Sequence, residues 1–159
     1  MAPRQTVLPL AYRLFFLIIE PISALVGAYY AHFQQDAYLS MTTHAAAVVP
    51  SPATSIIMSQ LANLYLLFAL NEALVLRCTG DLTIWKTVLF GLLIADVGHV
   101  YSVSSLGAWV YYDATRWNAI DWGNVPFVYL GASMRIAFLC GVGLGGQGQA
   151  NNTKTRKAA

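Results

Sequence analysis

Charged side chains are scarce in this sequence, and their scarcity excludes an ordinary soluble domain. Asp, Glu, Lys and Arg make up only 10% of the 159 residues, whereas hydrophobic residues make up 57%. A typical soluble domain carries about 25% charged residues. We therefore expect an integral membrane protein whose surface contacts the lipid bilayer. The formal net charge of +2 is too small, and the basic residues are too scattered, for a nucleic-acid partner.

Cysteine is nearly absent as well. Cys78 and Cys140 lie at the ends of hydrophobic runs, and two cysteines can form neither a disulfide framework nor a zinc site. We expect both to be packing thiols. His99 has no metal set around it, because His32 and His44 lie in the loop on the other side and the carboxylates have no HExxH-type spacing. The sequence therefore predicts no metal ion and no other cofactor.

Long hydrophobic runs are abundant, and a helix needs about 20 predominantly apolar residues to cross a bilayer. Four such runs predict an all-α protein, a four-helix transmembrane bundle in residues 1–146. We expect a loop over residues 32–53 and a disordered cytosolic tail over residues 147–159. Pro21, which follows Glu20, should kink the first helix because proline lacks a backbone N–H. The predicted helices cover about residues 7–31, 55–77, 84–110 and 124–145.

The distribution of basic residues predicts the orientation. An N-terminus in the cytosol would place seven of the nine on the cytosolic side, which favours an even number of spans and a cytosolic C-terminus. The tail ends in Arg156-Lys157-Ala158-Ala159, which resembles a dilysine-type retrieval signal of endoplasmic-reticulum membrane proteins. Attraction of a basic tail to anionic lipid is the alternative. We expect a multi-pass membrane protein of the endoplasmic reticulum.

Ionisable residues inside the hydrophobic runs are the main candidates for chemistry. Counting along each helix places Glu20, Asp96 and Arg135 near the midplane, with Glu72 nearer the cytosol and His99 on the face of Asp96. Buried arginine stays charged, so Arg135 needs a carboxylate partner, Asp96 or Glu20. At least one acid is left over, and a buried acid without a partner is suited to give or take a proton near neutral pH.

These residues have two interpretations. In the structural one, the ion pair only holds the bundle together. In the functional one, four residues are candidate catalytic groups: Glu20, Glu72, Asp96 and His99.

Polar residues near the acids and in the link before the fourth helix form a candidate pocket. The link could instead be an interfacial aromatic anchor, with Asp121 or Asn124 capping the helix. The candidate pocket residues are Asn71, Arg135, Trp117, Asn118, Asp121, Trp122 and Asn124.

Three passages carry a resemblance to a known family: LNEALVLRCTGDLTIW, LLIADVGHVYSVSSLG and RWNAIDWGNVPFVYLGASMRIAFL. Together they resemble a fungal family of small four-span membrane proteins without an assigned activity. The resemblance implies a fungal source and four spans, and brings no catalytic residues. A weaker similarity, of chemistry alone, relates the intramembrane acids to sterol-isomerase-like proteins and membrane cyclases of terpenoid assembly.

Three functions remain open. The first is a cyclase or isomerase of fungal lipophilic natural-product (secondary metabolite) biosynthesis, acting by intramembrane acid–base catalysis on a lipophilic small molecule beside other membrane biosynthetic enzymes. The second is a non-catalytic accessory or scaffold subunit of an endoplasmic-reticulum complex. A proton-coupled transporter is less favoured, because the sequence shows no inverted repeat.

Overall fold

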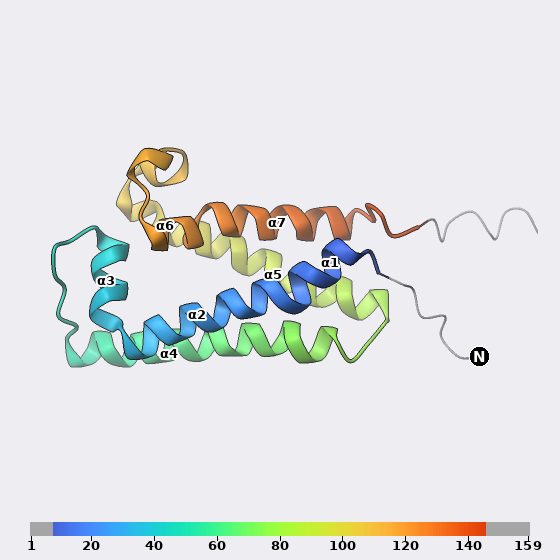
Figure 1. The fold of residues 1–159 in the computed structure, drawn as a ribbon, viewed down its shortest axis with the longest axis horizontal. Helices are drawn as coiled ribbons and strands as arrows, with labels where there is room; N and C mark the ends of the chain where they lie inside the picture. The colour runs from blue at the N-terminus through green and yellow to red at the C-terminus, as the bar shows by residue number, and fades with distance from the viewer. Residues whose placement is uncertain (1–7, 146–159) are drawn as a thin grey trace, which may run out of the picture.

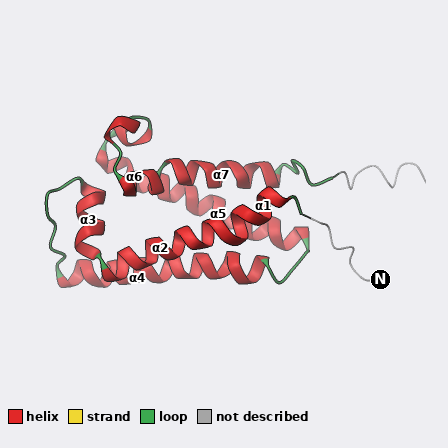
Figure 2. Cartoon of the chain, viewed as in Figure 1, coloured by secondary structure: helices red, strands yellow, loops and turns green. Residues whose placement is uncertain are grey.

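The computed structural model describes residues 8–145, and within them the chain forms helices and loops but no strand (Figures 1 and 2). The expectation of an all-α protein is confirmed. The predicted tail, residues 147–159, lies outside the described residues. The helices are α1 (Leu10–Leu14), η1 (Phe15–Ile19), α2 (Glu20–Phe33), α3 (Gln35–Thr43), α4 (Pro52–Leu70), η2 (Asn71–Leu76), α5 (Leu82–Ser102), η3 (Val103–Leu106), η4 (Ala108–Tyr111), η5 (Ala114–Arg116), α6 (Ala119–Asn124) and α7 (Pro126–Leu139).

Three helical stretches are long and apolar enough to cross a membrane: Leu10–Phe33, Pro52–Leu76 and Leu82–Leu106. They correspond to the first three predicted helices. The second and third begin slightly earlier than predicted, because Ser51 and Asp81 cap them. The Ser51 hydroxyl accepts from Thr54 N at 3.1 Å, and Asp81 Oδ1 accepts from Thr83 N at 2.7 Å.

The fourth predicted helix, residues 124–145, is divided and shortened. Val125 separates α6 from α7 with φ −119° and ψ −69°, and the proline at position 126 has no N–H with which to continue the hydrogen bonds of α6. At the other end α7 stops at Leu139, and Gly141 and Gly143 follow with positive φ. Glycine adopts this left-handed geometry at little cost, so it ends helices well.

Pro21 has an effect that differs from a simple kink. A proline at this position cannot donate to the Leu17 carbonyl four residues earlier. The chain forms a π-helical turn there, η1, and Arg77 Nη2 donates to Leu17 O at 2.7 Å. A second π-helical turn, η2, ends the next long helix, and the two turns pack against each other.

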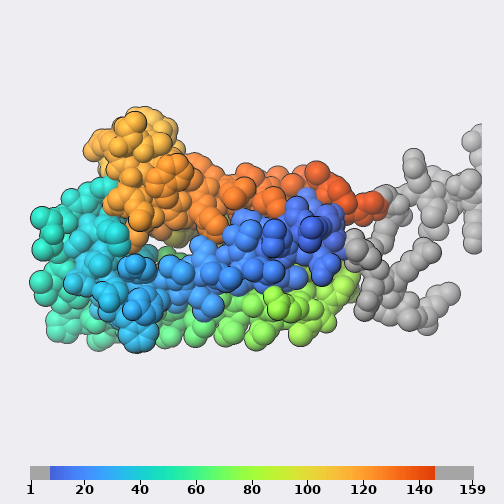
Figure 3. Space-filling view, viewed as in Figure 1, coloured from blue at the N-terminus to red at the C-terminus, as the bar shows by residue number. Residues whose placement is uncertain are grey.

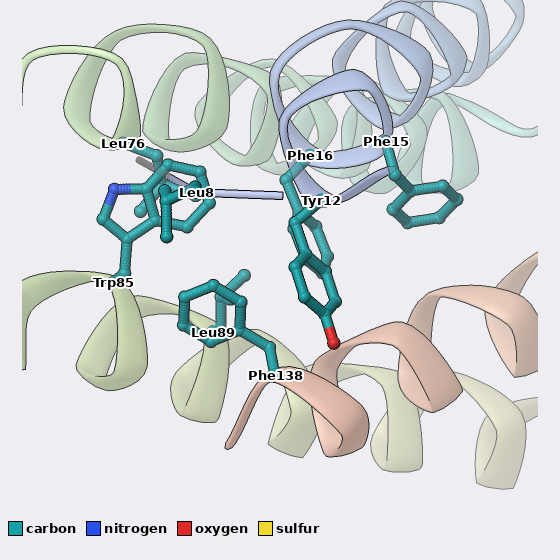
Figure 4. Close-up of a cluster of buried hydrophobic side chains, with 8 residues drawn as sticks. All are labelled: Leu8, Tyr12, Phe15, Phe16, Leu76, Trp85, Leu89 and Phe138. Carbon is teal, nitrogen blue, oxygen red and sulfur yellow. The ribbon is translucent and has the colours of Figure 1, made fainter. Parts of the chain in front are cut away.

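The long helices form two pairs, α2 with α4 and α5 with α7 (Figure 1). At one end, which we call the aromatic end, a buried cluster joins the pairs (Figure 4). Trp85 of α5 stacks on Phe138 of α7 with ring centroids 5.6 Å apart, and the Tyr12 hydroxyl donates to Val142 O at 2.9 Å. The cluster consists of Leu8, Tyr12, Phe15, Phe16, Leu76, Trp85, Leu89 and Phe138.

At the opposite end, the α3–α6 end, the helix α3 packs against α6. The expectation of a loop over residues 32–53 is therefore wrong for residues 35–43. This helix is held by the buried Tyr38, whose hydroxyl lies 2.9 Å from the Tyr65 hydroxyl of α4. Burial, together with the neighbouring Tyr65, raises the pKa of Tyr38 above its ordinary value.

The two cysteines do not pack in the interior. Cys78 and Cys140 are both exposed, so the expectation of packing thiols is wrong. Each lies just past the last residue of its helix, Leu76 for Cys78 and Leu139 for Cys140.

Candidate functional site

Arg135 lies in α7 with its side chain fully buried. Its Nη1 donates to Asp96 Oδ2 at 2.7 Å, and its Nη2 donates to Glu20 Oε1 at 2.7 Å and to Glu72 Oε1 at 3.2 Å. We call Glu20, Glu72, Asp96 and Arg135 the Arg135 cluster. The sequence predicted either Asp96 or Glu20 as the partner of Arg135, whereas the structure has both and adds Glu72.

Counting along its helix predicts that Glu72 lies nearer the cytosol than Glu20 and Asp96. In the structure it lies at the same level as these acids. Its side chain is 0% exposed and shares Arg135 Nη2 with Glu20. The count failed because it assumed that all four helices end at one level, whereas α1 begins at Leu10 and α7 ends at Leu139.

The two π-helical turns deliver the two glutamates. Glu72 lies within η2, and Glu20 is the first residue after η1. A π-helical turn contains more residues than an α-helical turn, so it rotates the side chains that follow, and such turns are frequent at functional sites. Glu20 and Glu72 are the only glutamates in the chain, and both meet at one guanidinium nitrogen.

Aromatic rings and a glycine enclose the guanidinium. The Arg135 Cζ lies 5.6 Å from the ring centroid of Phe16 and 5.5 Å from that of Phe68, within the range of cation–π attraction. Gly131, one turn earlier in α7, leaves the space that the guanidinium fills. A Cβ at Gly131 would lie 2.8 Å from Arg135 Nη1 and 3.1 Å from Glu20 Oε1.

The Arg135 cluster contains more acid than base. Three carboxyl groups surround one guanidinium, and Glu20 Oε2, Glu72 Oε2 and Arg135 Nε are buried without a hydrogen-bond partner among the described residues. Buried ionised groups are costly unless they are paired and hydrogen-bonded. The arrangement therefore favours retention of a proton among the carboxyl groups.

His99 is not a partner of Arg135. It interacts with the side chain and the backbone of Asn124, and its Nε2 is buried without a partner among residues 8–145. Asn71, half-buried, precedes Glu72 in η2. The structure thus separates His99 and Asn124 from the Arg135 cluster as a second polar contact between α5 and α6.

The link before α6 is a capped and hydrogen-bonded structure. Asn118, rather than Asp121 or Asn124, is the N-cap, because its Oδ1 accepts from Ile120 N at 2.9 Å while Asp121 Oδ2 accepts from Asn118 N at 2.9 Å. Asn118 Nδ2 also donates to Met41 O at 2.7 Å, which ties α6 to α3. Trp117 donates to Val110 O at 2.9 Å and packs edge-on against Trp122.

A group that the sequence did not single out completes the α3–α6 end. His44, in left-handed geometry after α3, lies 3.0 Å from Asp121 through its Nε2. The His44 ring packs edge-on against Trp109, and the Arg116 guanidinium lies 4.1 Å from the Trp109 ring centroid. Sequence reasoning missed His44 because its partner Asp121 is 77 positions away.

A family model described as "Domain of unknown function (DUF7704)" matches residues 5–145. The chain belongs to the DUF7704 family. The match includes every residue of the Arg135 cluster and the whole α3–α6 end. Comparison with curated proteins and with solved structures gave no match.

In this DUF7704 domain, the residues that the sequence predicted for the site lie in three separate groups. Glu20, Glu72, Asp96 and Arg135 converge, as the functional interpretation requires. His99 contacts Asn124 elsewhere. The residues Trp117, Asn118, Asp121 and Trp122 build the α3–α6 end, and their side chains bond to and pack against residues there and not the Arg135 cluster.

Proposed function

We propose that this DUF7704 chain is a multi-pass membrane enzyme, a cyclase or isomerase acting on a lipophilic natural product in a fungus. In this proposal the Arg135 cluster exchanges a proton with the substrate. The observation that carries the proposal is the presence of three carboxyl groups on one buried guanidinium. Intramembrane ionisable groups are costly and serve function more often than packing.

The exposure of the cluster supports contact with a substrate through only part of it. Asp96 and Glu20 retain 9% and 7% of their side-chain surface, whereas Glu72 and Arg135 retain none. Asp96 is therefore the group that would touch a substrate, because Glu20 Oε2 is buried and Glu20 Oε1 is bonded to Arg135. Figure 3 shows a hollow between α2 and the α6–α7 segment, next to α3. In this proposal the substrate enters there, between the helix pairs.

The proposal includes four membrane crossings in the endoplasmic reticulum, with both termini in the cytosol. The fourth crossing would be formed by α6 and α7, which follow each other in one direction across residues 119–139 (Figure 1). The basic residues Arg13, Arg77 and Lys86 would share the cytosolic side.

An accessory role is the alternative, and one observation favours it. Each of the three carboxyl groups already has a hydrogen bond from Arg135, so the cluster could serve only to join four helical segments. A scaffold subunit would then hold another membrane protein of the same complex. A proton-coupled transporter would use the same acids, and nothing in the two helix pairs favours it.

Amide replacement of each acid tests the proposal. Cells expressing E20Q, E72Q or D96N variants are compared with cells expressing the unaltered chain, and lipophilic extracts are analysed by mass spectrometry. We expect at least one product to fall about 100-fold, the lower range of acid–base contributions to catalysis. The control is D36N, which changes an exposed acid in α3.

The comparison is made only between variants whose level in the membrane equals that of the unaltered chain. Unchanged product profiles in all three variants would refute the enzymatic proposal. Unchanged profiles together with a membrane protein that co-purifies with the chain in mild detergent would instead support the accessory role.

A further inference from the structure

Both glutamates of the chain lie side by side at one nitrogen of Arg135. Nη2 donates to Oε1 of each, at 2.7 Å for Glu20 and 3.2 Å for Glu72. The two carboxyl groups are also within hydrogen-bonding reach of each other, yet the outer oxygen of each is buried and receives no N–H or O–H from another described residue. Two carboxylates cannot hydrogen-bond, since neither has a proton to donate.

We propose that Glu72 is protonated in the resting protein and donates its O–H to the Glu20 carboxylate. Like charges in one buried site do not both ionise, so one of two adjacent carboxyl groups keeps a proton. Glu72 is the carboxyl that receives the least compensation, because its bond to Arg135 is the longest of the three and its side chain is 0% exposed. Glu20 and Asp96, with bonds of 2.7 Å, remain the ionised partners.

The charges around the pair support this assignment. The elements packed against Glu72 contribute Glu20 from α2, Asp96 from α5 and Arg135 from α7, and η1 contributes only apolar side chains. With all three acids ionised the cluster would carry two net negative charges in a nearly water-free place. Protonation of Glu72 halves that excess.

The proton on Glu72 can move within the pair. It can pass to the neighbouring Glu20 and leave Glu72 as a carboxylate bonded to Arg135 Nη2. Glu72 would then be a proton reservoir and Glu20 the first acceptor of its proton. This use of the proton rests on the proposed function, whereas the protonation itself is a property of the folded chain.

Infrared spectroscopy of the full chain, purified in lipid vesicles at neutral pH, tests the proposal directly. A protonated carboxyl gives a C=O stretching band that shifts in D2O. We expect such a band, and we expect it to shift again when glutamate alone carries a ¹³C-carboxyl label. Because the chain has only two glutamates, this label needs no mutation and works even where a variant fails to fold.

Two variants then assign the band. We expect E72Q to lose it, and the surface variant D36N to keep it. A missing band, a band that does not respond to the glutamate label, or a labelled band that survives E72Q would each overturn the proposal. If a cation rather than a proton offsets the charge, the band is missing and sodium chloride raises the unfolding temperature more than choline chloride does.

The infrared result and the product profiles are independent. A Glu72 band without any change of product in E20Q, E72Q or D96N would support the protonation of Glu72 and refute the enzymatic function. A change of product without the band would support the enzymatic function and refute Glu72 as the proton reservoir.

Discussion

Gly131 lies one helical turn before Arg135, and the guanidinium occupies the space that any larger residue at position 131 would fill. A Cβ there would come within 2.8 Å of Nη1, which is held in place by its bond to Asp96. The glycine is therefore part of the cluster, although it carries no side chain.

We expect G131A to lower the unfolding free energy by about 1 to 3 kcal/mol, the usual cost of overpacking a buried site. Thermal unfolding in detergent measures the change. The matched control is G98A in α5, where an added Cβ meets nothing within 4 Å and alanine favours the helix. Equal stability of the two variants would show that the cluster is not tightly packed.

Removal of the Arg135 charge should destabilise the protein strongly. R135M leaves three buried acids without a cation, and breaking a buried ion pair in this way costs about 3 to 5 kcal/mol. The double variant R135M/D96N should recover part of that loss, because it removes one of the uncompensated acids. Chemical denaturation of the single and double variants measures the coupling.

R116M is the control for loss of an arginine, because Arg116 is exposed and lies over Trp109 outside the cluster. Additive effects of R135M and D96N would contradict an interaction between the two side chains.

The bond from Arg77 to Leu17 O should matter only because residue 21 is proline. We expect R77M to cost about 1 kcal/mol, typical of a single hydrogen bond. In a P21A background the cost should shrink, because the amide of residue 21 can then donate to Leu17 O. Thermal unfolding of the unaltered chain, R77M, P21A and R77M/P21A completes a double-mutant cycle. K86M is the control for loss of a basic residue at the same end. An undiminished cost in P21A would rule out this compensation.

Cysteine labelling can distinguish three membrane crossings from four. Cys78 and Cys140 are both exposed and lie at the aromatic end, where Tyr12 also contacts Val142. With four crossings, a membrane-impermeant maleimide should label both from the same side of sealed vesicles. A D36C variant without the native cysteines should be labelled from the opposite side. Labelling of Cys140 from the side of residue 36 would show that α6 and α7 do not cross.

Much of the fold was predictable because its determinants are local. The length of each hydrophobic run predicts a helix of membrane-spanning length, and the three long helical stretches lie close to where the sequence predicts them. The division at Val125 was also within reach of the sequence, since Pro126 alone disfavours a continuous helix there. The helix α3 was not, because its apolar anchor Tyr38 depends on Tyr65 of another helix.

The candidate site was predictable in its residues and not in its geometry. Burial of a charge is costly wherever it occurs, so the sequence by itself singled out Glu20, Asp96 and Arg135 as residues that need one another. Only the tertiary structure decided that Glu72 joins them and His99 does not. That outcome depends on how each helix is rotated about its axis, which two π-helical turns and the packing of four segments determine together.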